Sequence, residues 1–430
     1  IHSPLMAKIG FFSVSAYGHV TPLMTLAGRM RQRGHEVTYF QLPDHGARAK
    51  AAGVGFAAFG VAERPEGAIQ REFEEASKLE GLEAFERVIG ALLEESRLAL
   101  RDLPELVRDA GIEFGVVDEC FDARAAVMHA MGTPFASAAL ALTYEWEPGI
   151  PSWACPLPFS EDPDTVAQYA VWAEDVDGIA NILLGPINEF RAAHGQPGVE
   201  LLIDTHSNLL RISQQPACFD YPRKELPGIY HHTGPFLDAG MRPAAPFPWE
   251  RLDGRPLVYA AMGTLQNRMP EVWRAIAEAC GGLDAQVVMS LGGGMRPEEL
   301  GPLPANTIAV GYAPQPELLA RASAMITHAG MNSTLECLAN GVPMLAIPVA
   351  HDQMHLAQLI AWKGAGRRLP LEEVTAGRVR EELQEVLSDG RYRETATRIR
   401  GEIAAADGLN RAAALVEEAI RTGAPVLRPN

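Results

Sequence analysis

Two polar residues in the first third of the chain are suited to general-base chemistry. His19 lies in the segment Y-G-H-V-T-P (residues 17–22), shortly after an apolar run of strand length, and Asp118 directly follows a second such run. If both runs are parallel strands of one sheet, the two side chains lie at the same edge of it. An aspartate that accepts from one imidazole nitrogen leaves the other free to take a hydroxyl proton. Such a pair is suited to general-base chemistry, whereas a single loop histidine is more often structural and a strand-end aspartate is commonly a turn or cap residue.

A second candidate site lies where a predicted strand meets a helix. Residues 324–327 read as the strand, residues 328–330 as a turn, and the helix follows. The first N–H groups of a helix have no partner within it and lie at the positive end of its dipole, so they attract phosphate. Asn332 and Ser333 are in this first turn. Glu336 lies one turn further on, where its carboxylate can accept hydrogen bonds from two hydroxyls such as those of a ribose.

The elements around the histidine read as one strand–helix–strand unit. The apolar run 9–14 is a strand, the loop 15–20 follows, and Thr21 and Pro22 are predicted as the N-cap and first residue of an amphipathic helix. A second strand follows at 37–40. Such units build parallel sheets with helices on both faces, which predicts an α/β fold.

The rest of the chain continues this alternation in two halves. Residues 60–110 are predicted as two helices, residues 114–117 as the strand before Asp118, and the proline-rich, tryptophan-rich segment 145–177 as irregular. Later strands are predicted at 257–262, 286–291, 307–310, 324–327 and 344–348, with helices between them. We expect a first domain at 6–237, a proline-rich linker at 238–256, a second domain at 257–405, and a helical tail at 406–430 that packs back on the first domain.

Composition excludes several classes of function. The 430 residues include 37 basic and 54 acidic side chains, a net charge of −17, so the chain lacks the positive field that nucleic acids attract. Its five cysteines include no C-x-x-C pair, which fits a reducing cytoplasm. The uncharged stretch 125–144 is interrupted by Gly132 and Pro134, so we read it as a helix, a break and a buried strand. A cytoplasmic monomer or weak homodimer, without a membrane span or nucleic-acid partner, is expected.

The segment from Tyr312 to Gln353 resembles the donor-binding signature of the UDP-dependent glycosyltransferases that act on small lipophilic molecules, including bacterial macrolide, flavonoid and carotenoid glucosyltransferases. It contains Y-A-P-Q-P-E-L-L, T-H-A-G-M-N-S-T-L-E, G-V-P-M-L-A-I-P and H-D-Q in that order. Residues 17–22 are similar to the family's G-H-x-x-P loop. The resemblance implies the GT-B fold, with two Rossmann-like domains facing across a cleft.

The resemblance also implies which residues hold the nucleotide sugar. Tyr312 would stack on uracil, Glu336 would hold the ribose, and the helix N-terminus would hold the diphosphate. The other implied donor contacts are Ala313 and Gln315 at the base edge, Thr264, His328, Gly330, Asn332 and Ser333 at the diphosphate, and Asp352 and Gln353 at the sugar. Plant members usually have tryptophan where this chain has Tyr312; a phenol ring still stacks, but the choice between UDP and dTDP stays open.

The implied reaction is an inverting, metal-independent transfer of a sugar, with glucose favoured, to a hydroxyl of a small hydrophobic acceptor. The acceptor class ranges over polyketides, flavonoids, terpenoids and xanthophylls. His19 would be the base, held by Asp118, and the UDP-sugar is a co-substrate, so no cofactor is expected. Aromatic residues from the first half would line the acceptor cleft: Phe121, Tyr144, Trp146 and Trp153.

Other readings fit parts of the pattern. An epimerase-like UDP-sugar enzyme on the same fold, or a non-catalytic nucleotide-sugar-binding protein, would keep the donor segment without a lipophilic acceptor. Residues 351–355 (H-D-Q-M-H) are similar to the zinc motif H-E-x-x-H, but they directly follow a strand and Pro348, so no metal site is expected. Residues 175–177 read as a solvated acidic loop, and Gly292 to Gly294 as a turn.

Overall fold

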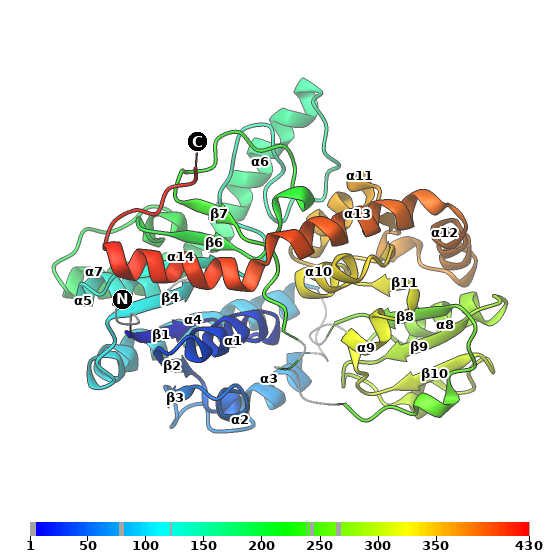
Figure 1. Cartoon of the computed structure of the whole chain (residues 1–430), viewed down its shortest axis with the longest axis horizontal. Helices are drawn as coiled ribbons and strands as arrows, with labels where there is room; N and C mark the ends of the chain where they lie inside the picture. Colours follow the sequence, from blue (N-terminus) through cyan, green and yellow to red (C-terminus); the bar gives the residue numbers. More distant parts are fainter. Residues whose placement is uncertain are drawn as a thin grey trace.

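The computed structural model describes residues 6–76, 81–120, 123–238, 240, 245–263 and 268–429. In this part of the chain two parallel β-sheets lie side by side, and helices cover their faces (Figure 1). The first sheet has seven strands in the order β3-β2-β1-β4-β5-β6-β7, and the second has six in the order β10-β9-β8-β11-β12-β13. The predicted α/β fold with two doubly wound lobes is confirmed.

The first lobe contains the N-terminal sheet. Its strands are β1 (Lys8–Phe12), β2 (Glu36–Gln41), β3 (Gly55–Ala58), β4 (Phe114–Asp118), β5 (Phe135–Ala139), β6 (Arg211–Ser213) and β7 (Tyr230–His232). Its helices are α1 (Tyr17–Gln32), α2 (Gly46–Ala51), α3 (Ala68–Ala76), α4 (Gly81–Asp109), α5 (Ala123–Met131), α6 (Pro163–Ala180) and α7 (Leu184–Ala193). Every residue of β4 and β5 is buried, as in a parallel sheet covered on both faces.

The second lobe repeats the pattern. Its strands are β8 (Leu257–Ala261), β9 (Gln286–Ser290), β10 (Thr307–Val310), β11 (Ala322–Thr327), β12 (Met344–Ala346) and β13 (Gly366–Arg368). Its helices are α8 (Pro270–Gly281), α9 (Gln315–Leu319), α10 (Met331–Asn340), α11 (Gln353–Lys363), α12 (Ala376–Ser388) and α13 (Gly390–Ala406). The strands predicted in this half are confirmed, with ends that differ by one or two residues.

The predicted start of the first helix was wrong. α1 begins at Tyr17, because the Ala16 carbonyl already accepts hydrogen bonds from the N–H groups of His19 at 2.9 Å and Val20 at 3.0 Å. Thr21 and Pro22 therefore lie inside the helix rather than at its start. The histidine is consequently carried by the first helical turn and not by a loop.

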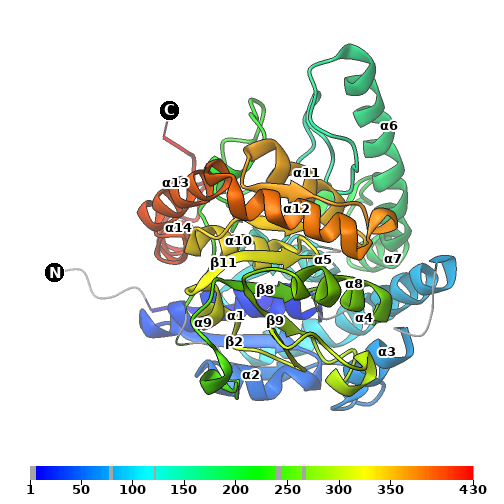
Figure 2. The same ribbon diagram turned by 90° about the vertical axis from the view of Figure 1, so that its right-hand side faces the viewer.

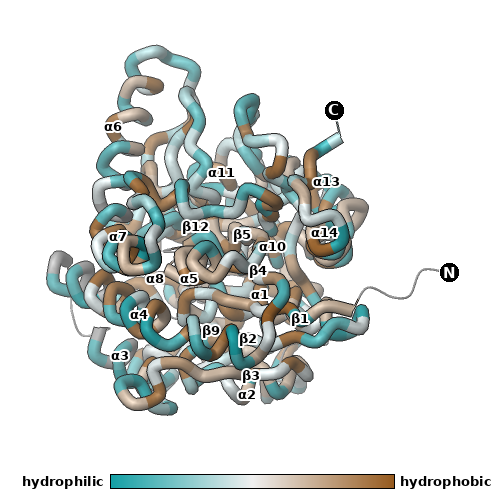
Figure 3. The backbone as a smooth tube through the Cα atoms, turned by 90° about the vertical axis from the view of Figure 1, so that its left-hand side faces the viewer, coloured by the Kyte–Doolittle hydropathy of each residue, from teal (hydrophilic) through white to brown (hydrophobic). Residues whose placement is uncertain are grey.

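The expectation of irregular structure throughout residues 145–177 was also wrong. The segment has no helix or strand up to residue 162, but α6 begins at Pro163, and proline is well tolerated at a first helical position because its missing N–H has no partner there anyway. α6 projects beyond the rest of the molecule (Figures 2 and 3). None of the helices in the described ranges combines the length and apolar character that a membrane crossing needs.

The end of the chain joins the two lobes. α13 packs on α10 of the second lobe, and α14 (Gly408–Thr422) packs on α1 of the first (Figure 1). Between the two helices, Asp407 has a φ of 46°, so the chain turns there through the left-handed region. The Glu417 carboxylate of α14 accepts a hydrogen bond from Nε of Arg33 at 2.7 Å, just after α1. α14 is thus held by the first lobe.

Replacing Gly408 by alanine is expected to lower the temperature of unfolding. A Cβ at this position would overlap the carbonyl group of Gly234, where the chain passes between the lobes, and overpacking of this kind costs about 1–3 kcal/mol. Gly401→Ala in α13 is the control, because its Cβ would meet open space, and it is expected to be neutral or slightly stabilising. Calorimetric midpoints that are equal for the two variants would contradict the tight contact.

Candidate functional site

His19 and Asp118 meet at the carboxyl edge of the first sheet. His19 lies in the first turn of α1, and Asp118 is the last residue of β4. The two atoms that join them, Nδ1 of His19 and Oδ2 of Asp118, are 2.8 Å apart. The His19 side chain keeps 17% of its surface exposed, and Nε2 has no hydrogen-bond partner within the described ranges. An imidazole held in this way presents one nitrogen to an incoming hydroxyl.

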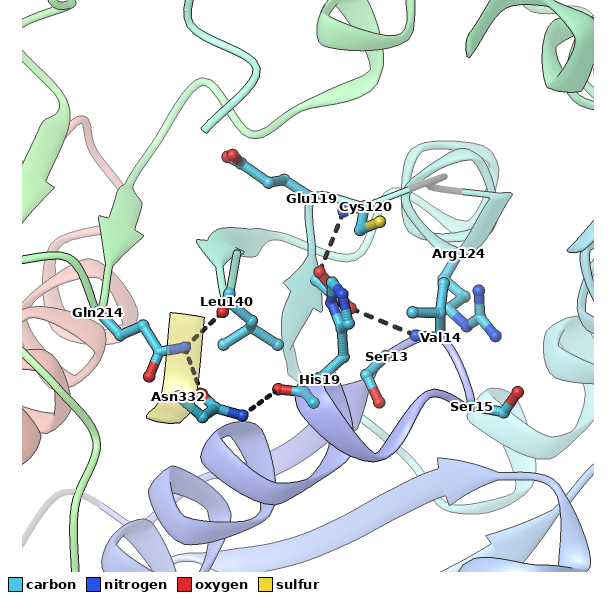
Figure 4. A network of polar contacts seen from close by, with 12 residues as sticks. Ser13, Val14, Ser15, His19, Glu119, Cys120, Arg124, Leu140, Gln214 and Asn332 are labelled. Atoms are coloured by element: carbon cyan, nitrogen blue, oxygen red, sulfur yellow. Dashed lines mark hydrogen bonds and ion pairs between the residues drawn. The ribbon is translucent and has the colours of Figure 1, made fainter. Parts of the chain in front are cut away.

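The Asp118 carboxylate is enclosed by donors. Its side chain is only 1% exposed. Oδ2 also accepts from the Val14 backbone N–H at 3.3 Å, and Oδ1 accepts from the Cys120 N–H at 3.0 Å (Figure 4). A buried carboxylate is stable only when such donors replace the water that it has lost. These bonds also fix the plane of the carboxylate, and thereby the direction from which His19 donates.

A buried ion pair holds the loop before α1. Glu95 of α4 accepts from the Ser15 N–H at 3.1 Å and from the Ser15 hydroxyl at 2.6 Å, and it pairs with the buried guanidinium of Arg124. The Ser15 carbonyl accepts from Nε2 of His45 at 2.9 Å. Because α1 begins two residues after Ser15, this network determines where His19 lies.

The charges around His19 raise its pKa above the ordinary value of 6.5. Burial, the largest single effect, lowers the pKa, but the charge and the hydrogen bond of the Asp118 carboxylate raise it. The charges of Asp352 and Glu95 act in the same direction. His19 is therefore a stronger base than a histidine in water.

The N-terminus of α10 has the features of an anion site. Its N-cap is Gly330, no side chain caps it, and no acidic residue lies in its first turn. A Cβ on Gly330 would overlap the His328 ring, and one on Gly263 would lie 2.7 Å from Nε2 of that ring. Burial lowers the His328 pKa to about 4, so the ring is neutral near pH 7. The helix dipole and the free N–H groups of the first turn make this end of α10 positive, which favours a bound anion.

Tyr312, for which the resemblance implies base stacking, has an exposed ring. It follows β10 and is 60% exposed. A Cβ on Gly293 would overlap the Tyr312 hydroxyl, and Gly293 has a φ of 80°, so the phenol rests on a backbone that only glycine allows. The turn 292–294 thus supports the ring. An exposed, supported ring is suited to stacking on a flat base.

Gln315 and Glu336 are joined by a hydrogen bond. Nε2 of Gln315 donates to Oε2 of Glu336 at 2.7 Å, and the Tyr259 hydroxyl donates to Oε1 of Gln315 at 3.2 Å. The Ser333 hydroxyl oxygen lies 3.5 Å from Nε2 of Gln315. Three predicted donor residues from α9 and α10 are therefore neighbours. Ala313 is partly buried against the core of this lobe.

Asp352 and Gln353 lie at the start of α11. Oε1 of Gln353 accepts from the N–H groups of Val349 at 2.8 Å and Ala350 at 3.1 Å, so this amide oxygen holds the preceding loop. Burial raises the pKa of Asp352, and its charge acts on His19 across the lobes. His351 lies before the helix, with a φ of 57°, so it does not share a helical face with the second histidine of the zinc-like motif. Among the described residues, no group of three or more ligand side chains is arranged for a metal.

Asn332 contacts the first lobe. Its Nδ2 donates to the Gly18 carbonyl at 2.8 Å, and its Oδ1 accepts from Nε2 of Gln214 at 3.0 Å (Figure 4). The resemblance implies a diphosphate contact for Asn332. In the structure the Asn332 side chain forms hydrogen bonds with groups of the protein, whereas its backbone N–H belongs to the open first turn of α10.

The predicted acceptor residues lie in different surroundings. The Tyr144 hydroxyl is 3.7 Å from Sγ of Cys120, two residues after Asp118, and the Tyr144 and Trp153 ring centroids are 5.7 Å apart. Trp153 also packs against the core of the second lobe, and Trp146 is 43% exposed. The structure brings Tyr144 and Trp153 together near the His19–Asp118 pair and leaves Trp146 at the surface.

Two predicted site residues, Phe121 and Thr264, lie outside the described residues. Sequence reasoning missed Glu95 and Gln214. Gln214 directly follows β6, so a polar residue at the carboxyl end of a parallel strand was the signal for it. Glu95 lies in the middle of a long helix, where no local pattern marks it.

Comparison with known proteins identifies the family. Residues 196–430, more than half of the chain, match the model of the UDP-glucoronosyl and UDP-glucosyl transferase family. A zeaxanthin glucosyltransferase from Pantoea ananas is 28% identical over 413 residues, which cover 96% of this chain and 95% of that protein. A demethyllactenocin mycarosyltransferase from Streptomyces fradiae is 29% identical over 430 residues, covering 96% of this chain and 86% of that protein.

Solved structures share the fold. The glycotransferase of kitacinnamycin has a TM-score of 0.75 at 22% identity and covers 97% of this chain and 99% of its own. CalG4, the calicheamicin glycosyltransferase, has a TM-score of 0.72 at 23% identity and covers 98% of this chain and 100% of its own. At these identities the likeness concerns the fold. The chain therefore belongs to the UDP-glucoronosyl and UDP-glucosyl transferase family and is a glycosyltransferase with the GT-B fold.

Proposed function

We propose that this glycosyltransferase moves glucose from UDP-glucose to a hydroxyl of a bulky lipophilic acceptor, with inversion at the anomeric carbon. The observation that carries the proposal is the meeting of two features from different lobes. The His19–Asp118 pair lies in the first lobe, and the hydrogen bond from Asn332 to Gly18 brings the open N-terminus of α10 beside the same helical turn. The base and the proposed anion site are thus brought close together.

In the proposed reaction, Nε2 of His19 takes the proton of the acceptor hydroxyl. The hydroxyl oxygen forms a bond to the anomeric carbon as the bond from that carbon to the diphosphate oxygen breaks. Asp118 stabilises the imidazolium that forms. The first N–H groups of α10 stabilise the negative charge of the departing diphosphate, because the helix dipole is already oriented toward it.

The donor assignment rests on the neighbours of α10. Tyr312 would stack on the base, and the Glu336 carboxylate, oriented by Gln315, would accept from the ribose hydroxyls. Asp352 would bind the sugar, because its charge already acts on His19, and the sugar must lie between the base and the diphosphate. The side-chain NH2 of Gln353 would donate to a sugar oxygen, since its amide oxygen holds the loop.

The acceptor assignment rests on the aromatic residues near the His19–Asp118 pair. Tyr144 and Trp153 supply flat apolar surface beside Cys120 and Asp118. The relatives named for zeaxanthin and demethyllactenocin support a large lipophilic alcohol. UDP release from UDP-glucose, measured with and without a panel of such alcohols, distinguishes transfer from the epimerase-like and non-catalytic readings. Mass spectrometry of the products identifies the sugar and the position.

Replacing His19 by alanine is expected to lower kcat about 10²–10⁴-fold, the usual contribution of a general base. The affinity for UDP, measured by calorimetry, is expected to stay the same because His19 belongs to the other lobe. His194→Ala, an exposed histidine of the first lobe just after α7, is the matched control and is expected to keep full activity. A His19→Ala variant that turns over like the control would show that His19 is not the base.

The pH dependence of kcat/KM is expected to report the His19 pKa. Activity should be lost as the pH falls through a pKa above 6.5, because the base must be neutral to accept a proton. Asp118→Asn removes the carboxylate that raises this pKa but leaves the imidazole buried. The fall of kcat/KM on the acid side should therefore move to lower pH, and the maximum value of kcat/KM should decrease. Asp175→Asn on exposed α6 is the control. An acid limb that does not move in Asp118→Asn would assign the titration to another group.

Replacing Glu336 by glutamine is expected to weaken UDP binding roughly tenfold, since hydrogen bonds to a charged group contribute about 1.5–3 kcal/mol. The new amide oxygen can still accept from Gln315, so the local fold is preserved. Glu382→Gln is the control, because Glu382 is equally buried but pairs with Arg367 and Arg378 of the same lobe. Calorimetry that gives equal UDP affinities for both variants would remove Glu336 from the donor site.

A further inference from the structure

The Gly18 carbonyl lacks its usual helical partner. In an α-helix the carbonyl of residue 18 accepts from the N–H of residue 22. Residue 22 of α1 is proline, which has no N–H, so this carbonyl is left open inside the helix. Nδ2 of Asn332 lies 2.8 Å from the Gly18 oxygen. An amide of the second lobe thus makes the hydrogen bond that the helix itself cannot make.

The other half of the Asn332 amide is also held by the first lobe. Its Oδ1 accepts from Nε2 of Gln214 at 3.0 Å, and the same Gln214 nitrogen donates to the Leu140 carbonyl (Figure 4). Gln214 is 1% exposed and follows β6, and Leu140 follows β5. The two donors of the Gln214 amide are therefore directed at one acceptor in each lobe.

These contacts connect the proposed diphosphate site to His19 over a short distance along the chain. Asn332 is the second residue of α10, whose N-terminus is the proposed diphosphate site, and Gly18 is covalently bonded to His19. Gln214, Asn332 and Glu336 also line one small cavity together with Thr21 and Pro22 of α1. A shift of α10 relative to α1 would break the Asn332 bonds and change the distance between the base and the donor.

We propose that Gly18, Gln214 and Asn332 form a cross-lobe latch that positions His19 over the sugar donor, with Pro22 leaving the Gly18 carbonyl open for it. Gln214 is a positioning residue in this arrangement, because it acts through Asn332. The inference rests on the proposed function, since it concerns the alignment of that base with that donor. It also assigns a role to the proline of the G-H-x-x-P segment.

A double-mutant cycle tests the latch. Gln214→Leu is expected to lower kcat at saturating UDP-glucose about tenfold, because small displacements of reacting groups have large effects on rate. Its UDP affinity is expected to stay within about twofold of the wild type, since Gln214 does not belong to the donor lobe. Asn332→Ala should lower kcat similarly, and the double variant should lose no more than the larger single loss, because the two residues act as one unit.

Gln358→Leu is the matched control. Nε2 of Gln358 donates to the Pro156 carbonyl at 2.7 Å, so this substitution also removes a hydrogen bond between the lobes, but one that joins α11 to the segment before α6. Its kcat is expected to stay close to that of the wild type, because this bond contacts neither His19 nor the N-terminus of α10. Unfolding temperatures of both leucine variants show that the comparison is made between folded proteins.

The outcomes separate the latch from the proposed function. If the wild type is active and Gln214→Leu has the same kcat as Gln358→Leu, the latch is overturned and the proposed function stands. The same conclusion follows if the losses of kcat in Gln214→Leu and Asn332→Ala multiply in the double variant. A Gln214→Leu variant that loses UDP affinity in proportion to kcat also overturns it, because the residue would then act on binding. A wild type that binds UDP and transfers sugar to no acceptor overturns both proposals.

Discussion

The hydrogen bond between Asp118 and His19 is the contact around which the first half of the site is arranged. A carboxylate that is almost fully buried needs several donors, and here they are the backbone N–H groups of Val14 and Cys120 and the imidazole. Val14 and Cys120 follow neighbouring parallel strands, β1 and β4, so the sheet itself supplies two of the three. Of these donors, the imidazole alone titrates near neutral pH, so the proposed proton transfer is assigned to it.

The proposed donor site in the second lobe has the opposite electrostatic requirement, which is to receive negative charge. It does so with an uncapped helix, a neutral His328 and the close approach that Gly263 and Gly330 allow. Ala329 has a φ of 65°, a conformation that costs of order 1–3 kcal/mol for a residue other than glycine. The loop lies between two regular elements, since β11 ends at Thr327 and α10 begins at Met331.

Much of the architecture could be predicted because long apolar runs and amphipathic helices carry a periodic signal. The strands β6 and β7 were missed, since three residues are too few to show a period. The start of α1 was misplaced because Thr21-Pro22 is a typical helix start, whereas the Ala16 carbonyl had already begun the helix. A proline in this position leaves one helical carbonyl without its donor, and that loss is offset by Asn332, which lies more than three hundred residues away in the sequence.

The order of residue types along the chain is enough to show which chemical groups stand at the ends of strands and at the starts of helices. This information is local, because every strand of a parallel sheet runs the same way and brings its last residue to the same edge. Which of these groups meet is visible in the folded molecule alone: Glu95 contacts Ser15, Gly293 contacts Tyr312, and Gln214 contacts Asn332. Such pairs depend on how elements far apart in the chain pack against one another, and no short-range pattern of residues encodes that packing.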